Sequence, residues 1–411
     1  MNSNYTKNTE EGFTPLTICE ELSRCLLCHD APCSASCPAK TDPAKFIRSA
    51  RFHNFKGAAE TIRENNPLGG ICARICPVEK YCQKACSRTG IDKPIEIAKI
   101  QQYITDFEET TKMNILKPVP KNDKNIAIIG AGPAGLSLAS FLLQKGYNVE
   151  IYEKEEQLGG YLRYGIPEYR LPNKVVDNEI RKIINLGLKV HKKTNIGTDI
   201  TEEEIKNTHD ATIYAIGLNK GKTLDLFKDI NFTETAVDLL KKIKRNKGLI
   251  KVPKKALIIG GGDVAMDIAT SLKKIGTDNV IVAAYEELKE WKSSKKELNL
   301  SKENNVSIYD GYIPISVKGN EVTLKHRNID STIKIKADKI ILAIGQEVNS
   351  NNLNVQFNND KIGDTTMRIA PFTYAVGDIT LNSEMTVVDA VRSAKELSEI
   401  IDRDLGGKQN D

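Results

Sequence analysis

Four cysteines lie within thirteen residues near the start of the chain, in the segment SRCLLCHDAPCSASCPAK at 23–40. They are Cys25, Cys28, Cys33 and Cys37. Thiols at this density can pair as disulfides, bind zinc or hold an iron–sulfur cluster. All nine cysteines of the 411-residue chain lie among its first 86 residues, so they indicate a site rather than scattered thiols.

A second run of cysteines, CARICPVEKYCQKAC at 72–86, has the same character. It holds Cys72, Cys76, Cys82 and Cys86, and in each run one cysteine directly precedes a proline. The first run resembles the bacterial ferredoxin run with its third cysteine two residues later; in two-cluster ferredoxins the cysteine before the proline serves the other cluster. These paired runs favour two [4Fe–4S] clusters. Because C-x2-C is also a zinc-ribbon spacing, a zinc-stapled scaffold without turnover is the alternative.

The expected compartment argues against disulfides. The first residues, MNSNYTKNTEEGFTPL, lack the basic start and apolar run of a secretory signal. We also find no stretch of about eighteen apolar residues that would predict a membrane span. We therefore expect a cytoplasmic protein with reduced thiols. The net charge of +5 is spread among acidic residues, so we expect neither nucleic acid nor a membrane as a partner.

The segment NIAIIGAGPAGLSLASFLLQKGYNVEIYEKE at 125–155 predicts a strand, a tight glycine turn, a helix and a second strand. Gly130 allows the turn, Gly132 lets the backbone approach a pyrophosphate, and Gly135 lets the helix pack closely on the strand. The helix N-terminus offers N–H groups to the phosphates, and Glu153 can accept ribose hydroxyls. This complete unit predicts a dinucleotide site.

A second such unit, KKALIIGGGDVAMDIATSLKKIGTDNVIVAAYEE at 254–287, carries Gly260, Gly262 and Ala265 in the pattern G-x-G-x-x-A. Two fingerprints predict two dinucleotides. We also predict strands at 211–217, 339–346 and 372–378, the last followed by a helix.

The second unit ends with Tyr285, Glu286 and Glu287 at the turn that meets the adenosine ribose. Sites for NADP usually place an arginine there to pair the 2′-phosphate, whereas a carboxylate accepts the free 2′-hydroxyl and repels a phosphate. For a nicotinamide nucleotide, which the resemblance given below assigns to this unit, the sequence therefore predicts NADH over NADPH.

The elements that must hold these residues suggest an α/β protein with two nested Rossmann-like dinucleotide-binding domains preceded by an α-helical domain with two [4Fe–4S] clusters. Helical periodicity runs through 43–67 and 94–109, and the proline-containing stretch 116–125 is predicted to be a linker. The predicted domains are a helical iron–sulfur domain at 1–118, a discontinuous dinucleotide-binding domain at 119–222 and 343–411, and a second dinucleotide-binding domain at 223–342. The resemblance given below makes the discontinuous domain the FAD-binding domain and the domain at 223–342 the NAD(H)-binding domain.

This layout resembles the two-dinucleotide-binding flavoproteins. That resemblance assigns FAD to the first fingerprint and the nicotinamide nucleotide to the second, and it adds a glycine pair and the YAVGD segment to the FAD contacts. The cofactor-binding residues so expected are Gly130, Gly132, Pro133, Ala134, Gly135, Glu153, Gly159, Gly160, Gly377 and Asp378 for FAD, and Gly260, Gly262, Asp263, Ala265, Tyr285 and Glu286 for NAD(H).

With the cysteine region added, nearly the whole chain resembles the FAD and iron–sulfur subunit of bacterial NAD-dependent dihydropyrimidine dehydrogenase. The motifs that carry this resemblance are RCLLCHDAPC, KFIRSARFHNFKGAAETIRENNPLG, YGIPEYRLP and GGGDVAMDIA. The glutamate synthase small subunit is similar but less so, because it usually has an aromatic residue between the proline and the third cysteine, where Pro32 here directly precedes Cys33.

The resemblance implies a ligand set for each cluster. One cluster would be held by Cys25, Cys28, Cys33 and Cys86, and the other by Cys37, Cys76, Cys82 and Gln101. Spacing alone would favour Cys72 over Gln101 as the eighth ligand.

The function expected from this resemblance is electron input. No cysteine follows Cys86, so the redox-active pair of disulfide reductases is absent, and no acid–base pair is evident. Flavin-based hydride transfer needs no catalytic side chain. We expect a subunit that passes electrons from NADH through FAD and two clusters to an FMN-containing catalytic partner that reduces uracil or thymine, in a hetero-oligomer such as a heterotetramer. The alternatives are a glutamate synthase small subunit, another electron-transfer subunit, or the zinc-stapled NAD-binding scaffold.

Overall fold

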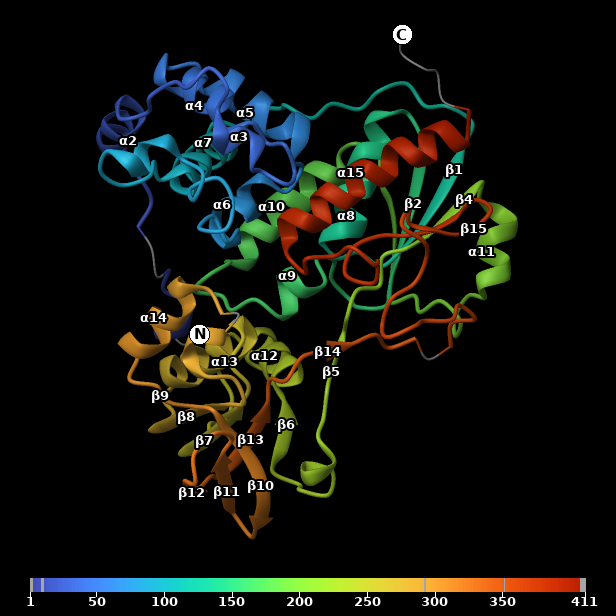
Figure 1. Cartoon of the computed structure of the whole chain (residues 1–411). Coiled ribbons are helices and arrows are strands. Elements are labelled where there is room, and N and C mark those ends of the chain that lie inside the picture. Colours follow the sequence, from blue (N-terminus) through green and yellow to red (C-terminus); the bar gives the residue numbers. More distant parts are fainter. Residues whose placement is uncertain (1–2, 9–10, 292, 351, 407–411) are drawn as a thin grey trace. The chain divides into compact units, whose positions relative to one another are not determined.

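The computed structural model describes residues 3–8, 11–291, 293–350 and 352–406 (Figure 1). Its contacts divide the chain into two compact units. Unit 1 comprises Met1–Thr9, Arg163–Pro172 and Leu218–Asn349, and unit 2 comprises Glu10–Leu162, Asn173–Gly217 and Ser350–Asp411. The domain boundaries predicted from the sequence stay a prediction.

Unit 2 begins with a region of short helices and connecting loops that contains all the cysteines, and we name this part the helical domain. Its helices are α2 (Pro15–Ser23), α3 (Pro32–Ala35), α4 (Pro43–Arg51), α5 (Phe55–Asn65), α6 (Gly69–Ile75), the 3-10 turn η1 (Ser87–Gly90) and α7 (Ile97–Thr110). They share one core around Leu22, Phe46, Ile62 and Ile100, and several cysteines pack against it. The α-helical character predicted for this region is confirmed.

The periodic segment 43–67 forms two helices rather than a continuous one. The chain breaks after α4, where His53 takes a left-handed φ of 59°. The side chain of Asn54 then caps α5 by accepting a hydrogen bond of 2.9 Å from the backbone N–H of Gly57. Apolar residues keep their helical spacing across the break, so periodicity alone gives no sign of it.

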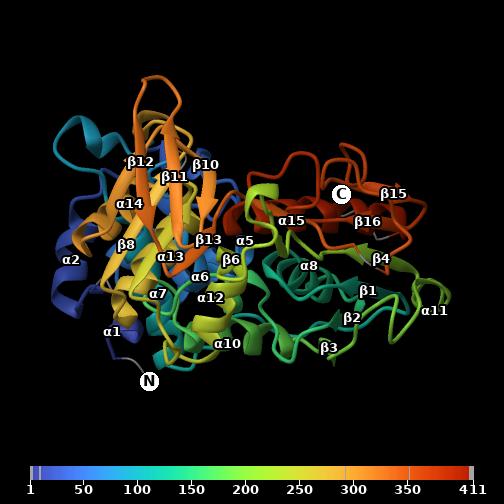
Figure 2. The ribbon, with the colours of Figure 1, turned by 90° about the horizontal axis from the view of Figure 1, so that it is seen from below.

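The second part of unit 2 is built on a mixed six-stranded sheet, and we name it the six-stranded domain. The strands are β1 (Asn125–Ile129), β2 (Asn148–Glu153), β3 (Lys189–Lys192), β4 (Ala211–Tyr214), β15 (Arg368–Ala370) and β16 (Thr373–Ala375), in the order β15-β16-β4-β1-β2-β3. All neighbours are parallel except β15 and β16. Helices α8 (Pro133–Gln144) and α15 (Val387–Asp404) lie side by side along this sheet (Figures 1 and 2). The other helices between these strands are α9 (Tyr161–Tyr164), α10 (Asn173–Ile184) and α11 (Glu202–Thr208).

Unit 1 contains a second doubly wound parallel sheet. Its strands are β6 (Thr233–Thr235), β7 (Lys255–Ile259), β8 (Asn279–Ala284), β9 (Ser307–Asp310) and β13 (Lys339–Leu342), in the order β6-β13-β7-β8-β9. Its helices are α1 (Ser3–Thr6), α12 (Ala236–Arg245), α13 (Asp263–Ile275) and α14 (Lys295–Glu303), with 3-10 turns η2 (Asp225–Phe227) and η3 (Leu288–Glu290). Two Rossmann-like sheets, as predicted, are therefore present.

A small antiparallel sheet completes unit 1. It consists of β10 (Tyr312–Lys318), β11 (Glu321–His326) and β12 (Thr332–Lys336), and a separate pair joins β5 (Lys220–Gly221) to β14 (Gln346–Glu347). The three strands stand together in Figure 2, and Val322 and Leu324 of β11 share a core with Leu257 and Ile340 of the larger sheet. This sheet has no counterpart among the strands predicted from the sequence. In the described parts of both units, no helix has both the length and the apolar character needed to cross a membrane.

Candidate cofactor sites

The first glycine turn connects β1 to α8 in unit 2. Gly130 has a φ of 105°, and a Cβ atom there would lie 2.6 Å from the carbonyl oxygen of Ala215. A Cβ atom on Gly135 would lie 2.1 Å from the carbonyl oxygen of Gly130, so neither position admits a side chain. At Gly132, by contrast, a Cβ atom would meet nothing within 4 Å. That open space, at the first turn of α8, suits the close approach of a pyrophosphate.

Glu153 lies at the end of β2 beside this turn. Its Oε2 atom accepts a hydrogen bond of 2.8 Å from the backbone N–H of Ala131, and its Oε1 atom accepts one of 2.9 Å from Glu155. Burial raises the pKa of this carboxyl, while the two backbone donors oppose that rise. The carboxylate is therefore held at the edge of the turn, where it can accept ribose hydroxyls.

Two further predicted segments converge on the same turn. The backbone N–H of Gly159 donates a 2.8 Å hydrogen bond to the carbonyl oxygen of Ala131. A Cβ atom on Gly160 would lie 2.8 Å from the Cα atom of Gly132, and one on Gly377 would lie 2.7 Å from the Cβ atom of Ala134. The structure thus brings together the segments that the resemblance assigned to FAD. Pro133 begins α8.

Asp378 follows Gly377 and is partly buried beside the turn. Burial raises the pKa of its carboxyl, and the Ser383 hydroxyl lowers it by donating a 3.1 Å hydrogen bond to Oδ1. The roles of these residues stay predictions, but their arrangement fits an FAD pyrophosphate and ribose.

The second glycine turn, in unit 1, repeats this geometry between β7 and α13. Gly260 has a φ of 130°, and a Cβ atom there would lie 2.3 Å from the carbonyl oxygen of Ala343. A Cβ atom on Gly262 would again meet nothing within 4 Å, and Ala265 is buried in the first turns of α13. Asp263, at the start of that helix, accepts a 2.8 Å hydrogen bond from the backbone N–H of Ser294. The turn therefore fits the pyrophosphate of a second dinucleotide.

An arginine that the sequence analysis missed lies at the predicted ribose turn of unit 1. The guanidinium of Arg327 lies 5.0 Å from the ring centroid of Tyr285, and it pairs with Glu290. Its Nη2 atom is also 3.9 Å from Oε1 of Glu287, whereas its Nε atom is buried without a hydrogen-bond partner among the described residues. The backbone carbonyl of Glu286 accepts a 2.9 Å hydrogen bond from the Trp291 indole. The turn therefore holds a cation that two carboxylates neutralise.

The first cysteine group unites the two cysteine runs in the helical domain. Burial raises the pKa of Cys25, and the nearby thiols of Cys86 and Cys28 raise it further. Burial also raises the pKa of Cys33 to about 11, again with contributions from Cys86 and Cys25. The Cys28 thiol donates to the Ser87 hydroxyl at 3.6 Å, directly after Cys86. These four thiols are neighbours, as the resemblance implied.

The second cysteine group lies beside the first. Burial raises the pKa of Cys76, and Cys72, Cys82 and Cys37 add to that rise. Burial raises the pKa of Cys82 to about 12, with contributions from Cys37 and then from Cys33 of the first group. Iron binds thiolates, so bound iron must displace the protons that burial favours.

Both candidates for the eighth ligand lie next to this second group. Gln101 is buried, and its Nε2 atom donates a 2.7 Å hydrogen bond to the carbonyl oxygen of Gly69 in α6, so the amide oxygen is its atom that can bind iron. Cys72, in the same helix, donates its thiol to Oδ1 of Asn66 at 3.9 Å. The choice between them, and the ligand assignment as a whole, stays a prediction.

The chemistry of the two cysteine groups fits iron–sulfur clusters. Each group gathers thiols from both cysteine runs, and thiolates are the ligands that such clusters take. In a [4Fe–4S] cluster each ligand binds a different iron, so two neighbouring groups of four donors suit two such clusters.

The second cysteine group also adjoins the six-stranded domain. The Tyr81 hydroxyl donates a 2.5 Å hydrogen bond to Oε2 of Glu384, in the segment between Asp378 and α15. Burial raises the pKa of Tyr81, and Glu384 and Cys76 are among the groups that add to this rise. Tyr81 therefore lies between the predicted cluster ligand Cys76 and the segment that leads from the first dinucleotide site to α15. The sequence carried no signal for this contact across 303 residues.

Comparisons with known proteins agree with this geometry. Residues 2–113 match the family described as dihydropyrimidine dehydrogenase domain II, 4Fe-4S cluster, and residues 124–394 match pyridine nucleotide-disulphide oxidoreductases. The chain is 48% identical over 407 residues to the NAD-dependent dihydropyrimidine dehydrogenase subunit PreT of Escherichia coli K12, covering 98% of each chain. It is also 48% identical over 400 residues to the PreT homolog of Salmonella typhi, covering 97% of each.

The chain belongs to the PreT family of NAD-dependent dihydropyrimidine dehydrogenase subunits. It is an NAD-dependent oxidoreductase, a flavin and iron–sulfur electron-transfer subunit whose cofactors are FAD, NAD(H) and [4Fe–4S] clusters. The fold is also shared with FprA of Mycobacterium tuberculosis in complex with NADPH, at a TM-score of 0.59 and 16% identity, covering 69% of this chain and 85% of that one. The resemblance inferred from the motifs is thus confirmed.

Proposed function

We propose that this protein is the NADH-oxidising subunit of a two-chain dihydropyrimidine dehydrogenase. It passes electrons from NADH, through FAD and two [4Fe–4S] clusters, to an FMN-containing partner that reduces uracil or thymine to the 5,6-dihydropyrimidine. One observation carries this proposal most directly. Within unit 2, the first dinucleotide turn and both cysteine groups belong to one compact body, and Tyr81 joins the second group to the segment after Asp378.

Each part of the chain has a distinct task in this proposal. FAD, when bound, would supply the acceptor for a hydride from NADH, and the clusters would supply one-electron transfer. The N-terminal turn of α8 and Glu153 hold the FAD pyrophosphate and ribose, and the turn before α13 holds the nicotinamide nucleotide. The cysteine groups and Gln101 hold the clusters. No side chain is asked to act as a catalytic acid or base.

The placement of the two groups suggests the order in which electrons leave. Helix α6, which carries Cys72, packs against α10 and α15, whereas α2, which leads into Cys25, lies away from the six-stranded sheet in Figures 1 and 2. We therefore place the second group next to the flavin and the first group at the exit.

A partner is needed because of the chemistry of the pyrimidine ring. Saturating its 5,6 bond requires a hydride donor against the ring and a nearby acid to protonate the adjacent carbon. A flavin that receives a hydride from NADH and delivers single electrons to clusters does not meet that requirement. We infer an FMN-bearing catalytic chain with its own acid, joined to this one in a cytoplasmic hetero-oligomer such as a heterotetramer.

Reconstitution tests the proposal. This chain alone should oxidise NADH with an artificial dye and leave uracil unchanged, while addition of a candidate FMN chain should cause loss of uracil absorbance. Reduction of uracil by this chain alone would refute the division of labour. Failure with the FMN chain, together with formation of glutamate when a glutamate synthase large subunit is added, would favour the glutamate synthase alternative instead.

A further inference from the structure

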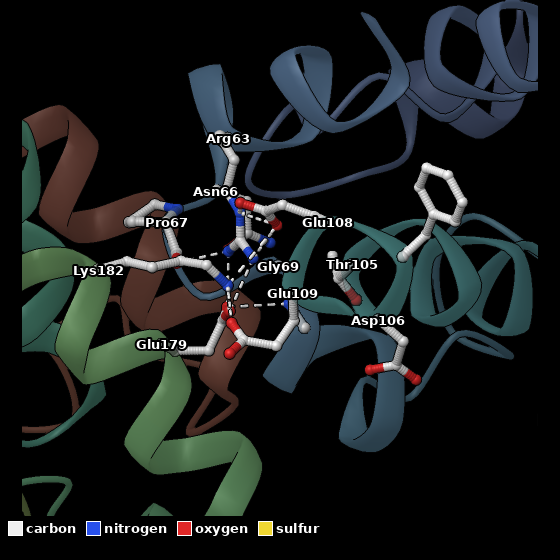
Figure 3. Close-up of polar contacts among 12 residues, drawn as sticks. Arg63, Asn66, Pro67, Gly69, Thr105, Asp106, Glu108, Glu109, Glu179 and Lys182 are labelled. Carbon is white, nitrogen blue, oxygen red and sulfur yellow. Dashed lines mark hydrogen bonds and ion pairs between the residues drawn. The ribbon is translucent and has the colours of Figure 1, made fainter. Parts of the chain in front are cut away.

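A buried arginine joins the helical domain to helix α10 of the six-stranded domain (Figure 3). Arg63 of α5 has no exposed side-chain surface. Its Nη2 atom lies 2.6 Å from Oε2 of Glu108 in α7 and 2.7 Å from Oε1 of Glu179 in α10, and its Nη1 atom lies 2.6 Å from Oε2 of Glu179. A third acceptor, the carbonyl oxygen of Pro67, lies 2.9 Å from Nη1. One guanidinium therefore bridges carboxylates from two domains.

The same contact fixes the helix that carries Cys72. The backbone N–H of Gly70 in α6 donates a 3.0 Å hydrogen bond to Oε2 of Glu179. A Cβ atom on Gly69 would lie 2.4 Å from Ile62 Cγ2, 3.6 Å from Arg63 Nη1 and 3.7 Å from Gln101 Nε2. The two glycines thus let the start of α6 approach both the arginine network and the candidate ligand Gln101. Movement of Glu179 would therefore displace the second cysteine group.

The network is highly charged although it is buried. Lys182, also on α10, lies 3.2 Å from Glu179, 3.3 Å from Glu109 and 3.7 Å from Glu108. Burial alone would lower the pKa of Arg63, but Glu179 and Glu108 raise it. Burial alone would raise the pKa of Glu179, but the charge of Arg63 lowers it to about 2. Both groups therefore stay charged at neutral pH.

These charges lie beside the helix that leads into the second cysteine group. Glu179 accepts a hydrogen bond from the backbone N–H of Gly70 in α6, and α6 ends at Ile75, directly before the predicted ligand Cys76. The buried charges and a cluster held by Cys76 would therefore lie at opposite ends of one seven-residue helix. Reduction of a cluster adds a negative charge, so a nearby carboxylate opposes reduction and a nearby cation favours it.

Stability alone is a weak reason for such a network. Desolvating several charges is costly, and well-packed apolar residues are often as stable as a buried ion pair. A bidentate arginine–carboxylate pair differs from an apolar contact because its two parallel hydrogen bonds are directional. They form only when the carboxylate lies within a narrow range of positions. A bidentate bridge therefore suits a task in which one distance between two domains must be kept.

We propose that Arg63 and Glu179 are positioning residues for the second cysteine group: they hold it at a fixed place on the six-stranded domain, and Glu179 lowers the reduction potential of the cluster bound there. This inference rests on the electron relay proposed above. It assigns a function to residues that bind neither a cluster nor a nucleotide.

The decisive experiment is a redox titration of the cofactor-loaded chain followed by electron paramagnetic resonance. Glu179→Gln removes a negative charge and keeps the size of the side chain, so it should raise the midpoint potential of one cluster and leave the other unchanged. Lys182→Met removes a positive charge from the same network, so it should lower the potential of that same cluster. Midpoint potentials that shift in opposite directions indicate an effect of charge. A change caused by loosened packing would not depend on the sign of the charge that is removed.

Asp106→Asn is the matched control. Asp106 of α7 pairs with Arg74 of α6 at 2.7 Å, but both residues belong to the helical domain and Asp106 is half-exposed. This variant also removes a carboxylate that pairs with an arginine near the second cysteine group. Water screens the Asp106 carboxylate, however, and its ion pair does not extend to α10. It should shift neither potential by as much as Glu179→Gln does.

Rapid mixing with NADH tests the positioning role. Arg63→Lys keeps the charge but loses the fork, so flavin bleaching should keep its rate while the later reduction of the clusters slows. Equal rates for both steps in Arg63→Lys and wild type would overturn the positioning role. Midpoint potentials that shift with the same sign, or not at all, in Glu179→Gln and Lys182→Met would overturn the electrostatic role. If Glu179→Gln fails to assemble clusters, the shift in Lys182→Met alone decides. None of these measurements uses a pyrimidine or a partner chain, so they fail independently of uracil reduction.

Discussion

The side-chain amide of Gln101 donates a 2.7 Å hydrogen bond to the carbonyl oxygen of Gly69, the first residue of the helix that carries Cys72. The hydrogen bond fixes which end of the amide can face a metal, because the nitrogen is already committed. It also ties the two candidates for the eighth cluster ligand to one short helix. Cys72 itself is buried, and its thiol hydrogen-bonds to Asn66.

The first prediction separates these two candidates. Gln101→Ala should disturb the absorption and paramagnetic spectra of one cluster, because it removes an iron ligand, whereas Cys72→Ala should leave both clusters intact. Cys19→Ala provides a control, since Cys19 is exposed in α2. The reverse pattern, with loss of a cluster in Cys72→Ala alone, would show that spacing rather than family resemblance identifies the ligand.

The second prediction concerns metal content. Two cubane clusters require about eight iron and about eight acid-labile sulfide per chain, together with one FAD. Anaerobically purified protein should therefore be brown, with metal and sulfide analysis giving these amounts. Cys28→Ser should lose about half of the iron, because Cys28 belongs to the first cysteine group only. Stoichiometric zinc without iron in such a preparation would instead support the zinc-stapled scaffold.

The parts of the site that sequence predicts are those whose geometry is local. Gly130 and Gly260 take left-handed φ values that a glycine fingerprint between a strand and a helix directly implies. The contact between Arg63 and Glu179 joins residues 116 positions apart, and no spacing rule connects them. Arg327 approaches Tyr285 because β10 packs against β8 and the backbone N–H of Arg327, directly after β11, donates to the carbonyl oxygen of Gly311, directly before β10.

The missed three-stranded sheet is a different case, because its sequence does carry a signal. EVTLKH at 321–326 and TIKIK at 332–336 alternate apolar and polar residues, which is typical of strands with one buried face. Strand alternation would have located β11 and β12, whereas the break at His53 depends on a backbone conformation that no apolar pattern encodes.

The third prediction is a pH dependence of stability in unit 1. Arg170 binds both Asp267, at 2.6 Å, and Glu297, at 3.0 Å. Burial raises the pKa of Asp267 to about 7, Arg170 opposes the rise, and Glu297 adds to it. Because the folded-state pKa is above the unfolded value of 3.8, this group's contribution to folding stability is present at low pH and lost as the pH rises through about 7.

Asp267→Asn removes that titration. Relative to wild type, the variant should therefore gain stability as the pH rises from about 4 to about 7, by an amount on the order of a few kcal/mol, and the difference should stay constant above about pH 7. Thermal unfolding of both proteins across this range measures the difference. Asp278→Asn, at an exposed position of the same unit, should show no such trend. A constant difference between Asp267→Asn and wild type at every pH would contradict the prediction.

The last prediction concerns nucleotide choice and involves the arginine that the sequence analysis missed. Arg327 is a cation at the predicted ribose turn, but Glu290 and Glu287 pair with it, so the turn presents carboxylates to the nucleotide. Wild type should therefore prefer NADH over NADPH by at least about tenfold in kcat/KM, or about 1.4 kcal/mol.

The double variant Glu287→Gln, Glu290→Gln should raise kcat/KM for NADPH, because it frees Arg327 to pair the 2′-phosphate. Adding Arg327→Gln to the double variant should abolish the gain, which distinguishes pairing by Arg327 from simple loss of repulsion. Dye-reduction assays with both nucleotides measure all of these values. Equal rates for NADH and NADPH in wild type would defeat the prediction and strengthen the glutamate synthase alternative, since those bacterial enzymes typically use NADPH.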